Sequence, residues 1–172
     1  ISSLKRVTSL TTLGVTISDR LDFSEHLQTV RSKAARSMYA LKTLRSHGLS
    51  GKELWQVCRA STVSYLTYAA PAWWGYADAC AKQQLQAVVA KLKKYGYLPS
   101  DCLTHEQLCG QMCDDLFKQV CSNPHHVLNN LLPPVRDTHY DMRKRAHDRQ
   151  IPKANDKFRK NFIIKMLYTD CY

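Results

Sequence analysis

Residues 22–46 read DFSEHLQTVRSKAARSMYALKTLRS, and this stretch decides the fold. Its apolar residues recur every three or four positions: Phe23, Leu27, Val30, Ala34, Met38, Leu41 and Leu44. That spacing places them on one stripe of an α-helix, and such a stripe has to be buried against other elements. Asp22, followed three residues later by Glu25, predicts the start of this helix, and Gly48 predicts its end. The stretch therefore indicates one member of a helical bundle.

A second helix is predicted directly after the first. Ser50 and Glu53 form a Ser-x-x-Glu capping box, which is typical of a helix start. The residues that follow are apolar on more than one side, so we expect this helix to be buried at the centre of the bundle. Pro71 is expected to end or kink it.

Two more helices follow from the same kinds of signal. Asp78 predicts the start of a third helix, and Gly96 predicts its end. Thr104 and Gln107 form another capping box before a fourth helix, which Asn123-Pro124 ends. The centre of the chain is thus expected to be a bundle of about four helices.

The two ends of the chain depart from the helical pattern. Residues 6–17 are rich in Val, Thr, Leu and Ile and predict one or two short strands, with Gly14 as a bulge or close backbone approach. The rest of that sheet is expected to lie outside this chain. Residues 135–154 indicate an extended basic arm, and Asn155 predicts the start of a last helix over 155–168. The expected fold class is mainly α, with a short N-terminal β remnant and a basic C-terminal arm ending in a helix.

The charge of the chain points to an anionic partner. The 172 residues carry a formal net charge of +11, and composition excludes collagen, low-complexity disorder and a short disulfide scaffold. Residues 1–60 hold ten basic and four acidic side chains, and residues 137–172 hold nine and five, whereas residues 61–136 are nearly neutral. Nucleic acid is the usual partner of so basic a chain, although a merely basic surface is the alternative.

Cysteine usage and hydropathy indicate where the protein acts. The seven cysteines are odd in number and irregularly spaced, and no secretory leader precedes them, which favours a reduced intracellular protein of the nucleus or cytoplasm. The first methionine is Met38, so the sequence is expected to be a fragment of a longer chain. The longest uncharged run, residues 60–77, contains Ser, Thr, Pro and Gly, and a membrane partner is not expected.

Basic side chains on the first helix are the main candidates for nucleic-acid contact. By helical angle, Arg31, Lys42 and Arg45 flank the apolar stripe, while Lys33 and Arg36 point away from it. Two or three of them could follow one phosphate backbone, although an ordinary solvated face has the same pattern. Two further basic clusters are Lys91, Lys93 and Lys94, whose charge complements a helix dipole, and Arg143, Lys144 and Arg145 on the arm.

The aromatic residues around Pro71 favour packing over base stacking. Tyr65, Tyr68, Trp73, Trp74 and Tyr76 crowd this bend with almost no basic residues between them. Stacking platforms for bases usually interleave aromatic and basic side chains. We therefore expect these rings to pack in the core and at the bend.

No catalytic motif is visible, and a metal site is open. The one acidic pair, Asp114-Asp115, lies on a predicted helix, where neighbouring side chains point about 100° apart rather than converging on metal ions. Four potential zinc ligands occur in a compact span: Cys109, Cys113, Cys121 and His125. The three cysteines also fall on the apolar stripe of their helix, where cysteine acts as a small buried hydrophobe.

Four stretches carry a likeness to a known family. They are residues 13–17 (LGVTI) with 21–26 (LDFSEH), residues 68–75 (YAAPAWWG), residues 116–134 (LFKQVCSNPHHVLNNLLPP), and residues 139–147 (HYDMRKRAH) with 161–168 (NFIIKMLY). In this order and spacing they resemble the C-terminal part of reverse transcriptases from non-LTR retrotransposons, the jockey-like and chicken-repeat-like long interspersed elements. The likeness extends over essentially the whole chain.

This resemblance implies a division and a function. It implies a palm and primer-grip remnant at 1–21, a thumb bundle at 22–98, post-thumb helices at 99–134 and a basic arm with a terminal helix at 135–172. RNA template and DNA primer are the implied partners, held by the thumb through the backbone of the RNA–DNA hybrid. The nucleic-acid-binding residues expected on this basis and from charge are Leu13, Gly14, Arg31, Lys33, Arg36, Lys42, Arg45, Lys93, Lys94, Arg143, Lys144 and Arg145.

The resemblance also limits what this chain is expected to do. The polymerase aspartates of the family lie upstream of the matching region, and their signature, an Asp-Asp pair that follows Phe-Ala or Tyr-Ala, is absent here. The chain is therefore expected to hold no cofactor and to be inactive alone, whereas the intact polymerase would use Mg²⁺. Two alternatives are open: a stand-alone basic helical module that binds nucleic acid or a protein, and a zinc-stabilised domain.

Overall fold

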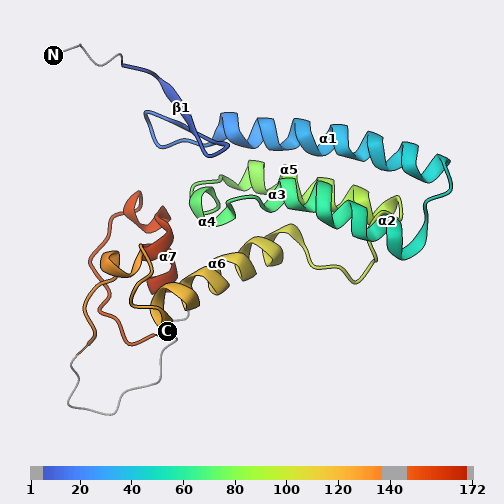
Figure 1. Cartoon of the computed structure of the whole chain (residues 1–172). Coiled ribbons are helices and arrows are strands. Elements are labelled where there is room, and N and C mark those ends of the chain that lie inside the picture. The colour runs from blue at the N-terminus through green and yellow to red at the C-terminus, as the bar shows by residue number, and fades with distance from the viewer. Residues whose placement is uncertain (1–5, 137–146, 170–172) are drawn as a thin grey trace. The chain divides into compact units, whose positions relative to one another are not determined.

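The computed structural model describes residues 6–136 and 147–169 (Figure 1). The chain is mainly helical, with a short two-stranded antiparallel sheet near the N-terminus, as the sequence predicts. It divides into two compact units: unit 1 comprises residues 1–69 and 76–109, and unit 2 comprises residues 70–75 and 110–172. The four segments implied by the family resemblance divide the chain by function. The packing into two units does not test such a division, so the four segments stay a prediction.

The N-terminal strands pair with each other in a hairpin. β1 (Ser9–Thr12) and β2 (Val15–Ser18) are antiparallel, and the register leaves two residues between them. These are Leu13, with φ of 47°, and Gly14, with φ of 79°, and positive φ at both positions is typical of a type I′ turn. Gly14 therefore belongs to the turn itself and is not the bulge that was expected.

The hairpin turn is held by an aromatic side chain of unit 1. The Tyr68 hydroxyl donates a hydrogen bond to the Leu13 carbonyl oxygen at 2.8 Å. A Cβ on Gly14 would lie 3.5 Å from Cε1 of the same ring, which is ordinary van der Waals contact, so the positive φ rather than a close approach favours glycine here. One hydrogen bond thus anchors the turn to the helical part of the unit.

α1 (Ser24–Ser46) begins close to the predicted position. Phe23 is its N-cap residue, and the Asp22 carboxylate accepts hydrogen bonds from the backbone N–H and the hydroxyl of Ser24, at 3.0 and 2.8 Å. The aspartate therefore orders the turn that precedes the helix instead of capping it directly. Most of the apolar stripe of α1 is buried as expected, with Leu27, Val30, Ala34 and Leu41 in the core, whereas Met38 is half-buried and Leu44 is exposed.

α1 and α5 (Ala79–Lys94) end in the same way, at the two glycines that the sequence indicates. Gly48 has φ of 95° and Gly96 has φ of 71°, and left-handed backbone after the last helical residues is characteristic of glycine. In each case the residue after the glycine closes the helix end. The closing hydrogen bonds run from Leu49 N to Leu44 O at 3.1 Å and from Tyr97 N to Leu92 O at 2.8 Å.

The second predicted helix is divided into three parts. α2 (Gly51–Cys58) passes into a π turn, η1 (Arg59–Val63), and then into α3 (Ser64–Thr67). The helix ends at α3, before the proline, because Ala69 adopts a positive φ of 51°. A separate short helix, α4 (Ala70–Trp73), follows and packs as part of unit 2.

The starts of the third and fourth helices agree with the sequence. The Asp78 carboxylate accepts a hydrogen bond from the third residue of α5 at 2.6 Å, which confirms it as the cap. α6 (His105–Ser122) begins at a complete capping box. There, the Thr104 N–H donates to Gln107 Oε1 at 2.8 Å and the Gln107 N–H donates to Thr104 Oγ1 at 3.2 Å.

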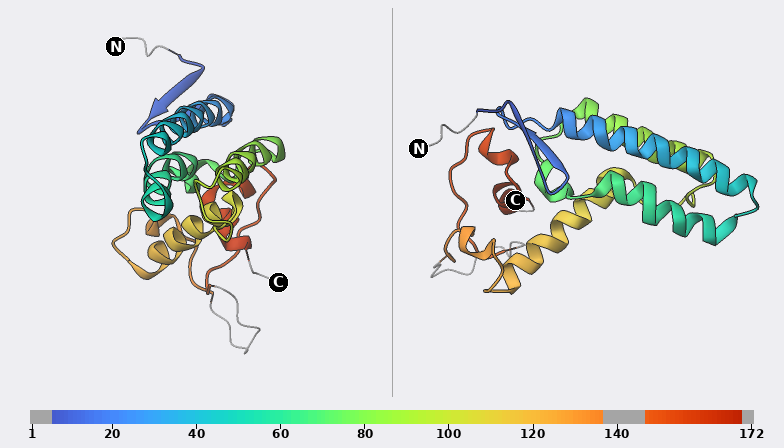
Figure 2. Two further views of the ribbon diagram at one scale, coloured as in Figure 1. Left: turned by 90° about the vertical axis from the view of Figure 1, so that its right-hand side faces the viewer. Right: turned by 45° about the horizontal axis from the view of Figure 1, so that its top comes forward.

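The core of unit 1 lies where α1 meets the α2–α3 stretch and α5 (Figure 2). The buried residues contributed by the second and third of these elements are Leu54, Cys58, Thr62, Leu66, Leu85, Val89 and Leu92. The α2–α3 stretch was expected at the centre, buried all round, yet Lys52, Gln56 and Arg59 on its outer side are exposed. α1 packs against both other elements, and it too has an exposed outer side.

Unit 2 contains α4, the second part of α6, and the C-terminal elements. These are η2 (Asn129–Leu131), η3 (Phe158–Lys160) and α7 (Phe162–Tyr168). Asn155, the expected cap of the last helix, accepts a hydrogen bond from Phe158 N at 2.9 Å and begins the short η3 turn instead. Asn161 caps α7, accepting from Ile163 N at 3.1 Å.

The core of unit 2 joins residues that are far apart in the sequence. Its buried side chains are Trp73, Trp74, Cys113, Phe117, Val120, Ile163, Ile164, Met166 and Leu167. His147 links two of the contributing helices, because its Nε2 lies 2.9 Å from the Leu167 carbonyl oxygen and its ring meets Phe117 edge-on. The described parts of the basic arm meet at an antiparallel bridge between Val135 and Arg149.

Candidate nucleic-acid interface

Two arginines of α1 are engaged within unit 1. Arg31 donates a hydrogen bond to Gln84 Oε1 at 2.7 Å. Arg45 donates to the Tyr95 carbonyl oxygen at 2.7 Å, and its guanidinium lies 4.7 Å from the centre of the Tyr97 ring. Both arginines therefore fasten α1 to α5 and the turn after it, which occupies part of their hydrogen-bonding capacity.

Lys93 has a similar role at the end of α5. Its ammonium donates to the Ser100 carbonyl oxygen at 3.2 Å and also to the Cys102 carbonyl oxygen. These bonds hold the connection between α5 and α6 in place. Lys94, the next residue, is exposed at the end of the helix.

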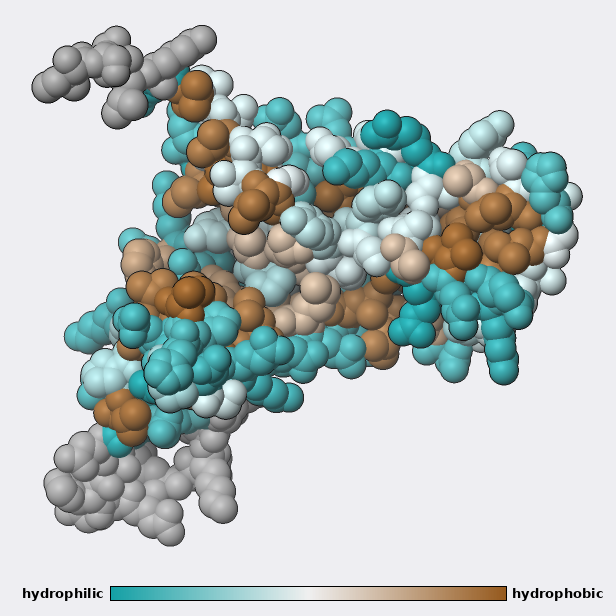
Figure 3. Space-filling view, viewed as in Figure 1, coloured by the Kyte–Doolittle hydropathy of each residue, from teal (hydrophilic) through white to brown (hydrophobic). Residues whose placement is uncertain are grey.

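The outer side of α1 carries the more accessible positive charge. Lys33, Arg36 and Lys42 are all exposed. Within residues 6–136 and 147–169, neither Lys33 nor Lys42 has an acceptor at hydrogen-bond distance. Tyr39 is 74 % exposed and lies midway between Arg36 and Lys42, so that the three follow one row along the helix. Figure 3 shows hydrophilic residues along this outer edge of α1.

Tyr39 was missed by the sequence reasoning, although a signal for it exists. It falls outside the stripe that runs from Phe23 to Leu44, so its ring could not belong to the same buried face. An exposed tyrosine between two cations provides a flat surface beside charges that bind phosphate. The candidate interface is therefore the row Arg36, Tyr39 and Lys42 together with Lys33.

A groove lies beside this row, between α1 and the α2–α3 stretch. Its volume is about 550 Å³, and it is lined by Lys33, Arg36, Ser37, Ala40, Leu41, Leu44, Val57, Ser61 and Tyr65. The inner wall is fixed by hydroxyl groups, because Ser37 donates to Ser61 Oγ at 3.2 Å and lies 2.6 Å from Thr62 Oγ1. Lys33 and Arg36, which were expected to point away from the apolar stripe, are both exposed and border this groove.

The π turn shapes the opposite wall of the groove. In η1 the backbone N–H of Ser64 donates to the carbonyl oxygen of Arg59, five residues earlier. A π turn is wider than an α turn, so residues four apart remain on nearly the same side. Val57, Ser61 and Tyr65 accordingly all line the groove.

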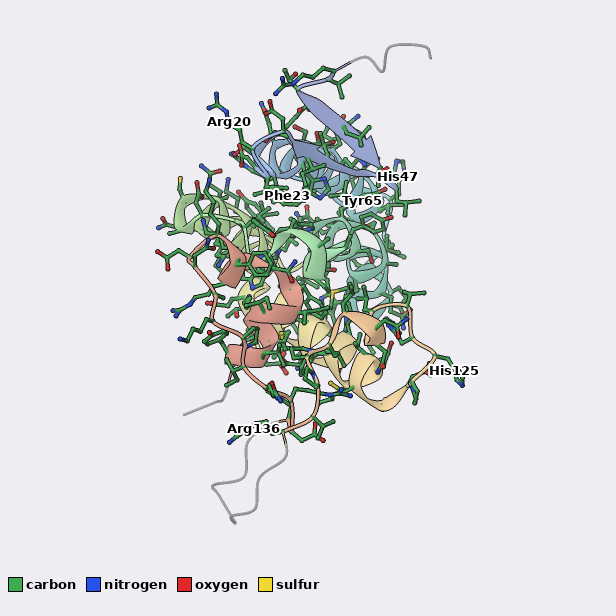
Figure 4. The ribbon with its side chains drawn as sticks, turned by 90° about the vertical axis from the view of Figure 1, so that its left-hand side faces the viewer. Arg20, Phe23, His47, Tyr65, His125 and Arg136 are labelled. Atoms are coloured by element: carbon green, nitrogen blue, oxygen red, sulfur yellow. The ribbon has the colours of Figure 1, made fainter. Side chains whose placement is uncertain are left out.

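The aromatic residues around Pro71 separate into two groups. Trp73 and Trp74 are buried, as the sequence predicts. Tyr65 and Tyr68 are 43 % and 52 % exposed and therefore lie outside the core, whereas Tyr76 is half-buried and packs against Phe23. Figure 4 shows Tyr65 in the space between α1 and the α2–α3 stretch.

The remaining predicted site residues lie elsewhere or outside the described residues. Leu13 is 87 % exposed at the tip of the hairpin, and Gly14 follows it in the turn. Arg143, Lys144 and Arg145 fall outside the described residues. The structure thus brings Lys33, Arg36 and Lys42 together on one helix and leaves the hairpin tip as a separate element.

The cysteines of the zinc hypothesis are spread along a single helix. Cys109 and Cys121 are twelve residues apart on α6, which corresponds to about 18 Å along its axis. One ion cannot bind both while α6 keeps this length. Burial also raises the pKa of the Cys113 and Cys121 thiols, whereas zinc requires the thiolate. Among the described residues, no group of three or more His, Cys, Asp or Glu side chains could hold a metal ion.

Buried histidines serve packing in unit 1. His105 is fully buried, and its Nε2 lies 2.9 Å from the Leu66 carbonyl oxygen, which joins the start of α6 to α3. Burial lowers the pKa of His105, although the hydrogen bond with Leu66 acts in the opposite direction. The pKa of His26 is lowered by burial and, secondarily, by the positive charge of Lys33.

The acidic pair, the helices and the comparisons with known proteins add no further site residue. Asp114 and Asp115, neighbours on α6, are both exposed, as expected of a solvated helix face. None of the helices in the described ranges is both long enough and apolar enough to span a bilayer. No protein-family model, no curated protein and no solved structure matches the chain.

Proposed function

We propose that this chain is the thumb and post-thumb part of a non-LTR retrotransposon reverse transcriptase. In this proposal the outer side of α1 binds the backbone of the RNA–DNA template–primer duplex. The resemblance of four ordered sequence stretches supports the polymerase assignment. The exposed basic row on α1 supports duplex binding, and this observation carries the proposal.

The row has dimensions that suit a nucleic-acid backbone. Arg36 and Lys42 are six residues apart on α1, about 9 Å along the helix axis, which corresponds to roughly three base-pair steps of one strand. Lys33, three residues before Arg36, extends the positive charge toward the groove. Long basic side chains at this spacing can contact successive phosphates. An RNA–DNA hybrid is recognised largely by its shape and backbone, so a row of cations is sufficient without groups that read bases.

The packing of α1 within unit 1 holds the row of basic residues in position. Its opposite side is buried in the core of unit 1, and Arg31 and Arg45 fasten it to α5 and the following turn. The cations therefore lie on a rigid support, which lowers the conformational entropy lost on binding. The basic residues that hold α1 in place are then distinct from those that contact phosphate.

The test is the salt dependence of binding to a short, blunt-ended RNA–DNA hybrid. Fluorescence anisotropy should show affinity falling steeply between about 50 and 200 mM salt. Replacing Lys33, Arg36 and Lys42 by Gln should weaken binding and lower the salt slope by about 2 to 3, since each lost phosphate contact contributes roughly 0.7 to 0.9. Binding that does not depend on salt would contradict the proposal.

A charge-matched variant controls for net charge. Lys118, Lys153 and Lys157 are exposed lysines of unit 2, and replacing them by Gln removes the same three charges. The control should keep most of the salt slope. If both variants lose affinity equally, the row on α1 has no special role. We expect no nucleotide incorporation on a primed RNA template, because the polymerase aspartates of the family lie upstream of the region that this chain resembles.

A further inference from the structure

The groove beside the basic row is not required for duplex binding. A duplex backbone is bound by a convex row of cations, whereas the groove is a concavity of about 550 Å³. That volume lies within the range of roughly 300 to 1,000 Å³ that is typical of small-ligand sites. The groove is therefore large enough for one small molecule or one unit of a polymer.

The two ends of the groove differ in chemistry. α2–α3 runs back along α1, with Ser37 hydrogen-bonded to Ser61 near the middle. Tyr65, one turn after Ser61, is consequently level with Lys33, one turn before Ser37. The far end is aliphatic, with Leu41, Leu44 and Val57 as its lining residues. An aromatic ring thus lies at the same end as the two cations.

The groups at the cationic end have capacity to bind a ligand. Arg36 uses its Nε in a long contact of 3.5 Å with the Ser32 carbonyl oxygen, which leaves its terminal N–H groups available. Within the described residues, neither Lys33 nor the Tyr65 hydroxyl has a hydrogen-bond partner. Ser37 and Ser61 already bond to each other. Of the lining residues in the described part of the chain, none is acidic.

We propose that this groove binds a single nucleotide, with its base stacked on Tyr65 and its phosphate between Lys33 and Arg36. A nucleotide carries an aromatic ring and a phosphate separated by one sugar, which matches a ring and two cations at one end of a groove. Base–aromatic stacking tolerates any base, so no preference among bases is expected. This inference goes beyond the proposed function, since a fully paired duplex has no free base to place there.

The experiment is a titration of the full chain with adenosine 5′-monophosphate, followed by amide NMR. Shifts are expected at residues of the groove, with affinity at least tenfold higher than for adenosine or inorganic phosphate alone. Tyr65→Leu should weaken nucleotide binding about tenfold, which is within the range of one lost stacking contact. Lys33→Gln should weaken binding of the nucleotide but not of adenosine.

A second tyrosine provides the matched control. Tyr95 is 48 % exposed, close to the exposure of Tyr65, and its side chain is not part of the groove. Tyr95→Leu should leave nucleotide affinity unchanged. The amide spectra of both variants show whether each is folded.

Equal nucleotide affinity in Tyr65→Leu and the unaltered chain would overturn the proposal. Decanoate, an alkyl carboxylate, tests whether the aliphatic end of the groove determines binding. If decanoate binds more tightly than the nucleotide, and equally well in Tyr65→Leu, the proposal is also overturned.

Binding of the RNA–DNA duplex distinguishes a failure of the nucleotide site from a failure of the proposed function. The affinity of Tyr65→Leu for a blunt-ended hybrid should be within about twofold of that of the unaltered chain. A base stacked on Tyr65 takes no part in contacts with the duplex backbone. Hybrid binding without nucleotide binding would overturn the groove assignment and leave the duplex interface standing. Nucleotide binding without hybrid binding would support the groove and contradict the duplex interface.

Discussion

Gly75 and Gly110 are the same residue type in unit 2, but only one of them is required by its surroundings. A Cβ on Gly75 would overlap the carbonyl oxygen of Lys160, which belongs to η3. Gly110 lies inside α6, and a Cβ there would meet nothing within 4 Å. The absence of a side chain therefore permits a close backbone contact at one site and only loosens a helix at the other.

The two glycines should respond oppositely to alanine. Gly75→Ala is expected to lower the free energy of unfolding by about 1 to 3 kcal/mol, because the backbone of η3 has to move. Gly110→Ala should raise it by about 0.5 to 1 kcal/mol, since alanine favours the helix. Urea unfolding followed by tryptophan fluorescence measures both changes. A free energy of unfolding that is unchanged or raised in Gly75→Ala would show that the backbone contact with Lys160 does not require glycine.

The engaged basic residues show what sequence alone could not predict at this scale. Helical angle correctly placed Arg31 and Arg45 at the borders of the buried stripe. Their acceptors, however, lie 53 and 50 residues away in the chain, at Gln84 and at the Tyr95 carbonyl oxygen. Local patterns cannot reveal such partners. The number of basic residues on α1 therefore overstates the charge that is available to a ligand.

Helix starts with and without a side-chain cap should differ in their effect on stability. Asp78 accepts a backbone hydrogen bond at the start of α5, whereas Ser50 occupies the N-cap position of α2 without a side-chain cap bond. Asp78→Ala is expected to cost about 1 kcal/mol of unfolding free energy. Ser50→Ala should cost clearly less, and the difference can be measured from urea midpoints. Equal losses would mean that the serine caps the helix in solution.

The helix boundaries that were predicted correctly have local signals. The capping box at Thr104 and the glycines after α1 and α5 act within one turn, so the sequence contains all the information that is needed. The π turn and the exposure of α2–α3 depend on packing against α1, which residue patterns do not specify. The hairpin was missed for a related reason: Gly14 indicated an irregularity but did not distinguish a bulge from a turn.

The whole chain combines a strong positive charge with two cores. Both units contain residues from separate parts of the sequence, because the segment 70–75 packs with the C-terminal elements. A net charge of +11 means that folding brings like charges closer together. Self-repulsion should therefore reduce stability when little salt is present.

Sodium chloride is expected to raise the midpoint of thermal unfolding. Screening becomes effective when the Debye length falls to about 10 Å, near 0.1 M salt. The increase should be smaller for the variant in which Lys118, Lys153 and Lys157 are replaced by Gln, because its net charge is lower. Circular dichroism at low and moderate salt provides the measurement. A midpoint that is independent of salt would indicate that repulsion is already relieved by the distribution of charges.

The π turn η1 has a consequence for insertions and deletions in this segment. A π turn holds an additional residue compared with an α turn, so losing one residue between positions 59 and 63 would restore an uninterrupted α-helix. The bond from Ser64 N–H to the Arg59 carbonyl oxygen would become an ordinary α-helical bond, and every later side chain would keep its present direction. Tyr65 would stay at the groove and Leu66 would stay in the core. A single codon deletion should therefore be tolerated within this turn, whereas the same deletion within α2 would rotate the residues after it by about 100° and remove the groove.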